Sequence, residues 1–204
     1  YEIMSKTIIF CLTLNPDHEN LIKKLSYVPV GLGDKKFTSD CFGDKTGINI
    51  SKKNPYYGEY TFHYWIWKNN MKIFNNSDWV GFCAYRRFWL NEQNDVNSKL
   101  PFKDKTLKEV PEIWNNYDVI LADKISMTNI KLIKILKYGK LALFKNPKSF
   151  LKKNRNIKFQ FDMFHGNGVL DKAIDVLNSR DREDFRKFVN DNQSINQANL
   201  FISR

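Results

Sequence analysis

The sequence predicts an α/β sandwich built on a mostly parallel central sheet. Two short apolar runs, residues 6–14 and 79–83, are bounded by polar residues, which is typical of strands buried on both faces. The expected elements follow the order strand, helix, loop, helix, strand, loop, strand, helix, helix, and this alternation favours a parallel sheet. Ligands of such folds bind at the carboxyl ends of the strands.

The first strand, residues 6–14, ends at a polar break, and a helix is expected over residues 17–25. An extended piece follows, and then a loop over residues 35–51 that is long enough to be functional. Thr13 ends the strand, while Asp44 and Asn49 close the loop. These three residues are candidate ligand contacts, although turn chemistry alone also accounts for the two in the loop.

An aromatic helix is expected to begin at Asn54, a good N-cap, with Pro55 as its first helical residue. Asn69-Asn70 ends the pattern. An aromatic stripe at helical spacing is predicted to face a core or a pocket; it consists of Tyr57, Tyr60, Tyr64 and Trp67.

Two arginines, Arg86 and Arg87, follow the apolar run 79–83, where that strand must leave the core. Two fixed cations at the end of a central strand favour an anionic ligand. The alternative is that one of them pairs with a core carboxylate such as Glu59 and is structural.

The second half predicts a strand at 117–122, a helix within 127–138 and a lysine-rich segment at 140–158. An aromatic segment, 159–168, contains Asp162 and His165. Asn167 is expected to cap a helix over 169–178, and a last helix over 182–190 is expected to bury Phe185, Phe188 and Val189.

The chain is strongly basic, with a formal net charge of +11. This balance favours an anionic partner, namely nucleic acid, acidic lipid or a phosphorylated small molecule, although a solvated basic surface is the plain alternative. Three cysteines without CxxC spacing predict free thiols in a reducing cytoplasm. No apolar run approaches the roughly 20 residues of a membrane span.

The chain begins at Tyr1 and stops at Arg204, directly after the apolar run 200–202. Such a run at the end predicts a half-made element. We therefore expect residues 1–204 to be one catalytic domain that is truncated at its C-terminus or belongs to a longer protein.

Several pieces, in this order, resemble a bacterial glycosyltransferase family of capsular and exopolysaccharide gene clusters. They read YVPVGLGD, TGINIS, KNPYYGEYTFHYWIWKN, VGFCAYRRF, YDVILA and NLFISR, and the resemblance covers most of the chain. It implies a GT-A-like fold and a hexosyltransferase. The family motif falls on Asp44, Gly47, Asn49, Ser51, Asn54, Glu59, Tyr64, Trp65, Trp67, Lys68, Asn69, Tyr85, Arg86, Arg87 and Asn199.

This chain departs from the family pattern at three positions. Ala84 stands where the family usually has a His before Tyr-Arg-Arg, Ile48 where it often has a second Asp, and Leu200 where it has Met. If the missing His touches donor or acceptor, the departure implies a different sugar preference or weaker activity. The Tyr-Arg-Arg residues that would bind phosphate are kept.

The expected donor site consists of Thr13, Asp44, Asn49, Glu59, Tyr64, Tyr85, Arg86 and Arg87. Since arginine forks bind phosphate oxygens directly, a divalent metal is not strictly required. The alternative is that Asp40 and Asp44 bind Mg or Mn. The candidates for the catalytic base are Asp162, His165 and Asp171, with Glu59 and Asp44 as further ones.

The resemblance therefore implies transfer of a sugar from a nucleotide sugar, expected to be a UDP-sugar, to a glycan or lipid-linked glycan acceptor of a surface polysaccharide. A cytoplasmic protein is expected, with peripheral contact to an anionic membrane through residues 140–158. One alternative is a nucleotide-sugar-binding domain without activity. The other, a nucleic-acid-binding module, is disfavoured because no RNA-binding motif occurs.

Overall fold

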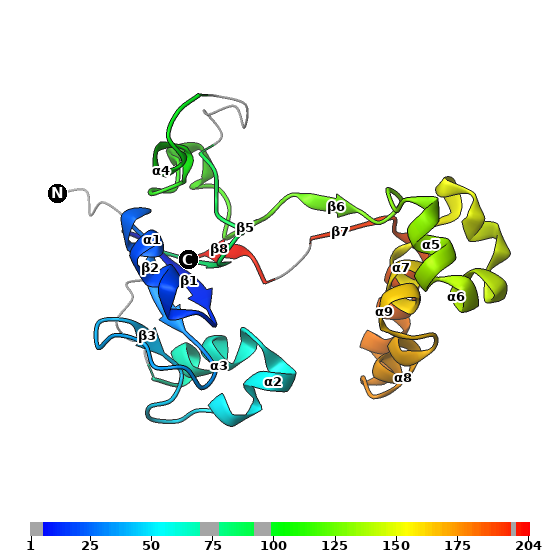
Figure 1. The fold of residues 1–204 in the computed structure, drawn as a ribbon, viewed down its shortest axis with the longest axis horizontal. Coiled ribbons are helices and arrows are strands. Elements are labelled where there is room, and N and C mark those ends of the chain that lie inside the picture. Colours follow the sequence, from blue (N-terminus) through cyan, green and yellow to red (C-terminus); the bar gives the residue numbers. More distant parts are fainter. Residues whose placement is uncertain (1–5, 70–77, 92–98, 197–198) are drawn as a thin grey trace. The chain divides into compact units, whose positions relative to one another are not determined.

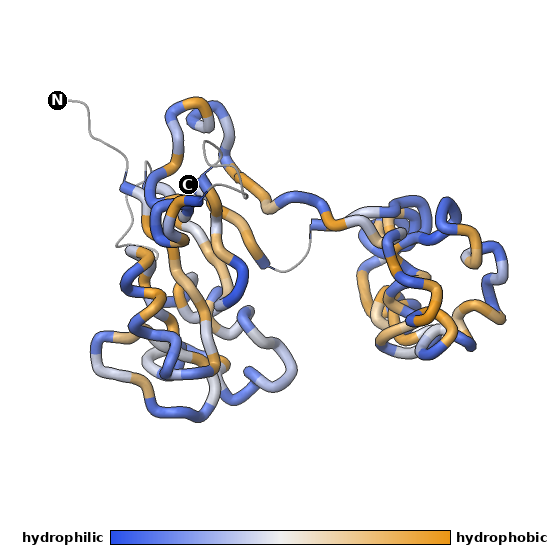
Figure 2. The backbone as a smooth tube through the Cα atoms, turned by 45° about the horizontal axis from the view of Figure 1, so that its top comes forward, coloured by the Kyte–Doolittle hydropathy of each residue, from blue (hydrophilic) through white to orange (hydrophobic). Residues whose placement is uncertain are grey.

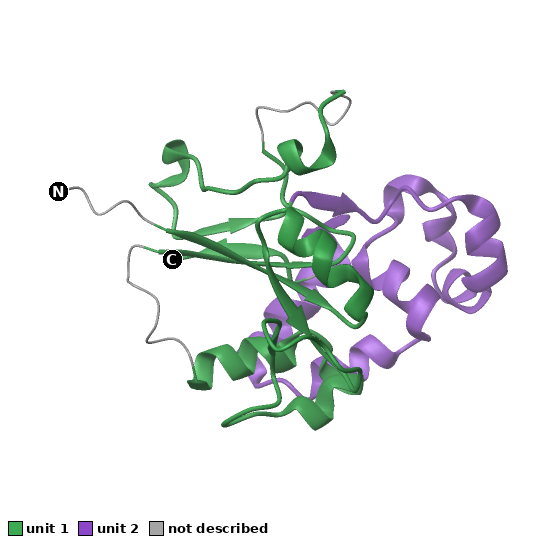
Figure 3. Cartoon of the chain, turned by 60° about the vertical axis from the view of Figure 1, so that its left-hand side comes forward, with its two compact units in different colours: residues 1–122, 198–204 green, residues 123–197 purple. Residues whose placement is uncertain are grey.

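The computed structural model describes residues 6–69, 78–91, 99–196 and 199–204. Their contacts divide the chain into two compact units (Figure 3). Unit 1 comprises residues 1–122 and 198–204, and unit 2 comprises residues 123–197. Each unit is described by itself, and the expectation of one catalytic domain across both stays a prediction.

Unit 1 contains a six-stranded sheet in the order β3-β2-β1-β4-β8-β5 (Figure 1). Strands β1, β2, β3 and β4 run parallel, while β8 is antiparallel to both of its neighbours. The expected mostly parallel sheet is confirmed. The strands are β1 Thr7–Thr13, β2 Val28–Gly31, β3 Phe42–Gly43, β4 Trp79–Ala84, β5 Val119–Leu121 and β8 Phe201–Ser203.

Helices cover both faces of this sheet, which makes unit 1 an α/β/α sandwich. Successive residues of β1 point to opposite faces: Phe10 and Leu12 pack with the helix residues Phe62 and Trp65, whereas Cys11 packs on the other side. The covering helices are α3 Tyr60–Asn69 on one face and α1 Glu19–Lys24 on the other. Short helical pieces complete the unit: η1 Pro16–His18, η2 Ser51–Lys53, α2 Asn54–Tyr57, α4 Phe102–Lys105 and η4 Glu112–Trp114.

The closing apolar run is not a half-made element. It forms β8, which pairs with β4 on one side and β5 on the other, and Ile202 is fully buried. Three apolar residues are too few to identify a strand from sequence. The run becomes an interior strand of the sheet only because it pairs with β4 and β5.

The aromatic helix is broken into α2 and α3, and Asn54 is the first residue of α2, not its N-cap. Gly58 interrupts the helix with φ of +53°, a left-handed conformation that glycine adopts without strain. The Asn54 amide spans the break by donating to the Gly58 carbonyl and the Thr61 hydroxyl. The expectation of one continuous helix capped by Asn54 is therefore wrong.

The predicted aromatic stripe faces outward. Tyr57, Tyr60 and Trp67 are exposed and Tyr64 is half-buried. The residues of α3 that face the core lie one or two positions after Tyr60 and Tyr64 and are Thr61, Phe62, Trp65 and Ile66. Because α3 is aromatic on more than one side, the spacing alone does not decide which side is buried.

Unit 2 is a bundle of short helices with a two-stranded antiparallel ribbon. Its core gathers Met127, Ile157, Leu170, Ile174 and Val189. The elements are β6 Lys124–Ser126, α5 Leu132–Tyr138, α6 Lys140–Lys145, η5 Pro147–Phe150, η6 Lys152–Asn154, α7 Ile157–His165, α8 Val169–Asp175, α9 Ser179–Asp191 and β7 Ser194–Asn196.

Two details of unit 2 differ from expectation. Gly168 with φ of +80°, and not Asn167, occupies the N-cap of α8. Phe185 and Phe188 of α9 keep more than a third of their surface exposed and stack on each other, so that Val189 alone of the three is buried. In the described part of the chain, no helix has the length and apolar character needed to cross a membrane.

Candidate functional site

The carboxyl ends of three neighbouring strands meet at one edge of the unit 1 sheet. Thr13 of β1 lies opposite Gly31 of β2, and Leu12 lies opposite Ala84 of β4. The backbone amide of Tyr85 donates to the Leu12 carbonyl at 2.9 Å, so the pairing continues past the end of β4. Since neighbouring strands are about 4.8 Å apart, the ends of β2 and β4 are separated by about 10 Å.

The chain turns sharply after β4, and Arg86 lies at the turn. The Arg87 amide donates to the Ala84 carbonyl at 2.9 Å, and Arg86 has φ of +83°. A residue with a Cβ in this conformation costs roughly 1 kcal/mol. The turn therefore holds Arg86 in a strained backbone conformation, and Ser26, with φ of +65°, is the other described non-glycine residue with a positive φ.

Both arginine side chains point into solvent. Arg86 and Arg87 are exposed, and neither makes a hydrogen bond or ion pair with any residue that the structure describes. Within that part of the chain, the expected alternative of a structural pair with Glu59 does not occur. Two guanidinium groups are therefore available to an anionic ligand at this edge.

His18, which is not among the residues predicted from the sequence, belongs to the same edge. Its Nδ1 atom and the Thr13 hydroxyl are hydrogen-bonded at 2.8 Å, and its ring stacks on Tyr85 with the planes 13° apart. Burial lowers the pKa of His18, and the nearby Arg86 cation lowers it further, so both favour the neutral imidazole. In the sequence, only the position of His18 in the turn after the first strand indicates that its side chain lies at this edge of the sheet.

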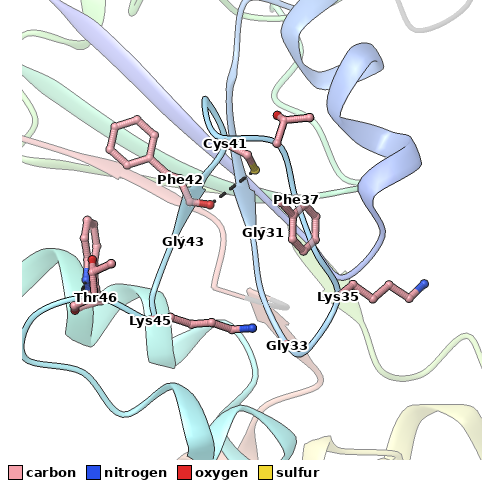
Figure 4. A pocket seen from close by; sticks show the side chains of 11 residues that line it. Gly31, Gly33, Lys35, Phe37, Cys41, Phe42, Gly43, Lys45 and Thr46 are labelled. Atoms are coloured by element: carbon pink, nitrogen blue, oxygen red, sulfur yellow. Dashed lines mark hydrogen bonds between the residues drawn. The ribbon is translucent and has the colours of Figure 1, made fainter.

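A pocket of about 370 Å³ lies beside this edge, at the ends of β2 and β3 (Figure 4). A Cβ at Gly31 would lie 2.3 Å from the Phe37 ring, so the ring packs directly on the strand only because Gly31 has no side chain. Aromatic walls and two lysines suit a flat, anionic ligand. The pocket is lined by Gly31, Gly33, Lys35, Phe37, Thr38, Cys41, Phe42, Gly43, Lys45, Thr46 and Trp65.

Helix α3 holds the loop that follows this pocket. The Trp65 indole donates to the Thr46 carbonyl at 2.8 Å, and the Asn69 amide bonds to both the N–H and the carbonyl of Ile48 at 3.0 and 2.8 Å. Gly47 has φ of +54°, and a Cβ there would lie 2.3 Å from the Asn69 amide oxygen. The loop at residues 46–48 and helix α3 therefore depend on each other, because Trp65 and Asn69 of the helix fix the conformation of the loop.

Asn49, an expected ligand contact, is occupied by the turn itself. Its amide donates to the carbonyls of Lys45 and Gly47 and accepts from the backbone and hydroxyl of Ser51. These bonds fit the alternative in which turn chemistry explains the residue. Its role in ligand binding stays a prediction.

Asp44 is the polar group of this region whose partners are missing. It is fully buried, and both carboxylate oxygens lack a hydrogen-bond partner among the described residues. It lies in sequence between Gly43 and Lys45, which line the pocket, while its own side chain is not part of the lining. A buried carboxylate without partners is costly, so Asp44 is the group that most needs an additional donor.

Glu59 and Tyr64, the other two expected contacts in unit 1, are half-buried. Burial lowers the pKa of His63, and the negative charge of Glu59 offsets part of that shift. Tyr64 packs edge-on against Trp67, with the Lys68 ammonium 3.5 Å from the Trp67 ring. Among the described residues, no hydrogen bond or ion pair joins Glu59 or Tyr64 to the two arginines.

His63 predicts a pH dependence of stability. Its ring lies against Phe82 and Phe201, its Nε2 atom is buried with no hydrogen-bond partner among the described residues, and burial lowers its pKa. As the pH falls below about 6.5, the unfolded chain takes up a proton before the folded chain does, so the free energy of unfolding decreases. We expect the urea midpoint to be constant from pH 8 to 7 and to fall between pH 6.5 and 5.

The variant His63→Phe removes this titrating ring and should make the decline shallower, with the remainder due to His18, whose pKa is also lowered. His165→Asn, at an exposed histidine of unit 2, should leave the decline as in the parent. Urea unfolding followed by tryptophan fluorescence reports on unit 1, because every tryptophan lies in it. A parent and a His63→Phe variant with equal slopes would contradict this assignment.

Three of the expected base candidates, Asp162, His165 and Asp171, belong to unit 2. Lys158 bonds to Asp162 at 2.7 Å and to Asp171 at 2.8 Å, and it links α7 to α8. Burial lowers the pKa of Lys158, but the two carboxylates outweigh it and the net shift is upward. His165 is exposed and lies against Phe161. The base role of these residues stays a prediction.

The described residues do not gather three or more His, Cys, Asp or Glu side chains as a metal site would require. Asp40 is held by Lys23 and Thr38, and the Lys23 bond is the main reason that its pKa falls to about 2. The end of β4 carries two cations where a metal would need carboxylates. These side chains therefore do not fit a divalent metal at the end of β4.

The comparisons with known proteins agree with this fold. A family model described as a domain of unknown function, DUF4422, matches residues 12–204. The solved structure of WbbM, described as a bifunctional glycosyltransferase in its apo form, is similar with a TM-score of 0.56 and 21% identity. The match covers 98% of this chain and 34% of that one, so this chain spans about a third of WbbM. No curated protein matches.

The likeness to WbbM places the α/β/α sandwich of unit 1 among GT-A-like folds. Since the family model spans nearly the whole sequence, the chain belongs to the DUF4422 family.

Proposed function

We propose that this chain is a glycosyltransferase that binds a UDP-sugar and transfers its sugar to a glycan or lipid-linked glycan acceptor. The observation that carries the proposal is the pair of exposed arginines, Arg86 and Arg87, at the same sheet edge as the pocket of β2 and β3. The GT-A-like fold and the WbbM likeness support glycosyl transfer. The resemblance of the sequence motifs supports a surface polysaccharide as the product.

The arrangement suits a nucleoside diphosphate in both chemistry and reach. The pocket offers Phe37 and Trp65 for a base and Lys35 and Lys45 for negative charge. The ends of β2 and β4 are about 10 Å apart, which is on the order of the distance from a base to its diphosphate. The base then lies at β2 and the phosphates at the two arginines.

Glycosyl transfer breaks the bond between the anomeric carbon and the diphosphate oxygen, and the bonding electrons stay on that oxygen. The two guanidinium groups stabilise the charge that develops there. The acceptor hydroxyl attacks the anomeric carbon and gives its proton to a base. We propose this base among His165, Asp162 and Asp171, and His165 is the one of the three that Lys158 does not engage.

Donor binding is proposed not to require a divalent metal, because the two arginines neutralise the diphosphate themselves. Titration calorimetry of UDP in excess chelator tests this: we expect binding there and no gain on adding Mn or Mg. Affinity that appears only with metal would refute the metal-free site and favour the alternative at Asp40 and Asp44. Absence of UDP binding with or without metal would refute the proposed function itself.

Activity is tested by measuring UDP release from a panel of UDP-sugars with glycan acceptors. The alternative of an inactive nucleotide-sugar binder rests on Ala84, which stands where the similar family has a His. That alternative predicts binding without release in every combination. Thermal stabilisation by oligonucleotides and not by UDP would instead support a nucleic-acid-binding module.

A further inference from the structure

Unit 2 contains a long basic stretch that no acidic residue interrupts. Between Asp123 and Asp162 the sequence has no Asp or Glu. Its lysines from 131 to 153 are exposed, and none forms an ion pair with a described residue. They are Lys131, Lys134, Lys137, Lys140, Lys145, Lys148, Lys152 and Lys153.

Large apolar side chains are exposed among these lysines. Ile133 of α5 is 78% exposed and Phe144 of α6 is 84% exposed. The same helices bury Ile135 and Ala142 in the core of unit 2, so their outward side is apolar in addition to the inward one. Figure 2 shows hydrophilic and hydrophobic stretches alternating along this part of the chain. Leu132, Leu136, Leu141, Phe150 and Leu151 are also exposed by about half.

A shallow hollow of about 390 Å³ brings the start of α5 next to the residues around η5. Leu132, Phe150 and Leu151 form its apolar part, and Lys152 lies beside them. Arg155 also lines it, and its guanidinium bonds only to backbone carbonyls among the described residues. These elements therefore share one face on which apolar and cationic groups adjoin.

We propose that this basic-apolar surface, residues 131–153, docks unit 2 on an anionic lipid bilayer. Its apolar side chains would enter the interface, while the lysine ammonium groups reach the lipid phosphates on their flexible stems. A protein partner is disfavoured because protein interfaces are depleted in lysine. Each lysine near an anionic surface strengthens binding by about fivefold.

Co-sedimentation of the full chain with vesicles tests the proposal. We expect binding to phosphatidylcholine vesicles that contain phosphatidylglycerol, weak binding to phosphatidylcholine alone, and release as salt is raised. Lys145→Glu with Lys148→Glu should weaken binding to the anionic vesicles at least about 25-fold. Ile133→Ser with Phe144→Ser should weaken it at least about tenfold, the value for two side chains that are half-inserted.

The control variants are Lys172→Glu and Val176→Ser of unit 2, which lie outside the surface and are exposed like their counterparts, and both should bind as the parent does. Failure of the parent to bind anionic vesicles at low salt, or equal loss in the controls, would overturn the proposal.

The same variants give a different result if the occupant of the basic-apolar surface is protein and not lipid. If another part of the chain or a second copy packs on residues 131–153, the pair Ile133→Ser and Phe144→Ser lowers the melting temperature or the sedimenting mass without changing vesicle binding. That outcome refutes the bilayer as the occupant. The test uses no donor or acceptor, so its failure leaves the proposed glycosyl transfer untouched.

Discussion

Arg86→Ala is expected to weaken UDP binding about 10- to 100-fold, and Arg87→Ala by a similar factor. The reason is that each guanidinium donates charge-assisted hydrogen bonds to the diphosphate, and each such bond contributes about 1.5–3 kcal/mol. Neither side chain makes a hydrogen bond or ion pair with another described residue, although the Arg86 guanidinium lies 5.9 Å from the centre of the Tyr85 ring. Titration calorimetry with UDP measures the loss directly.

The turn itself provides a sharper version of this experiment. Arg86 has φ of +83°, which glycine adopts without strain. Arg86→Gly is therefore expected to weaken UDP binding as Arg86→Ala does, while the free energy of unfolding stays equal or rises by up to about 1 kcal/mol. A side chain kept only for folding would show the opposite, with lower stability and unchanged affinity.

The matched control is Arg180→Ala, at an exposed arginine of α9 in unit 2. It changes the net charge by the same amount and should bind UDP as the parent does. If Arg86→Ala and Arg87→Ala both retain the affinity of the parent, the phosphate site does not lie at the end of β4.

Arg155→Met is expected to destabilise unit 2 by several kcal/mol, roughly 4, because it removes a charged donor from four backbone carbonyls in buried or partly buried hydrogen bonds. Arg155 is 3% exposed and donates to the carbonyls of Thr128, Ile130, Ser149 and Phe150 at 2.9–3.1 Å. Each buried carbonyl that loses its donor costs about 1–3 kcal/mol. Arg155→Lys should recover little, since one ammonium does not reach four acceptors.

Far-UV circular dichroism during urea unfolding measures this change, because unit 2 is mostly helical. Tryptophan fluorescence reports on unit 1 alone in the same sample. Arg180→Met provides the surface control and should unfold with the parent. An Arg155→Met chain whose dichroism transition coincides with that of the parent would show that this arginine does not hold the segment together.

The fold of unit 1 was largely predictable because its central strands are buried on both faces. Strands β1 and β4 must be apolar throughout, and such runs stand out between polar breaks. Strand β8 has three residues and carries no such pattern, so it becomes a strand only through pairing with β4 and β5.

The candidate site shows the same division. The two arginines were identifiable, because charged residues directly after a buried strand must leave the core. His18 was not, since a single histidine in a polar turn has no spacing that links it to Tyr85 sixty-seven positions later. The outward side of α3 was assigned wrongly because its aromatic residues occur on both sides.

The sequence by itself determined the parallel sheet, the positions of its central strands and the pair of cations at the end of β4. A buried strand is a run of apolar residues, and the point where it leaves the core is marked by polar or charged residues. Only the tertiary structure decided that Thr13, His18, Tyr85 and the two arginines share one edge. It also decided that Trp65 and Asn69 hold the loop, that Lys158 engages Asp162 and Asp171, and that Arg155 is a buried anchor. These roles depend on contacts between distant segments, and such contacts produce no regular spacing of residue types in the sequence.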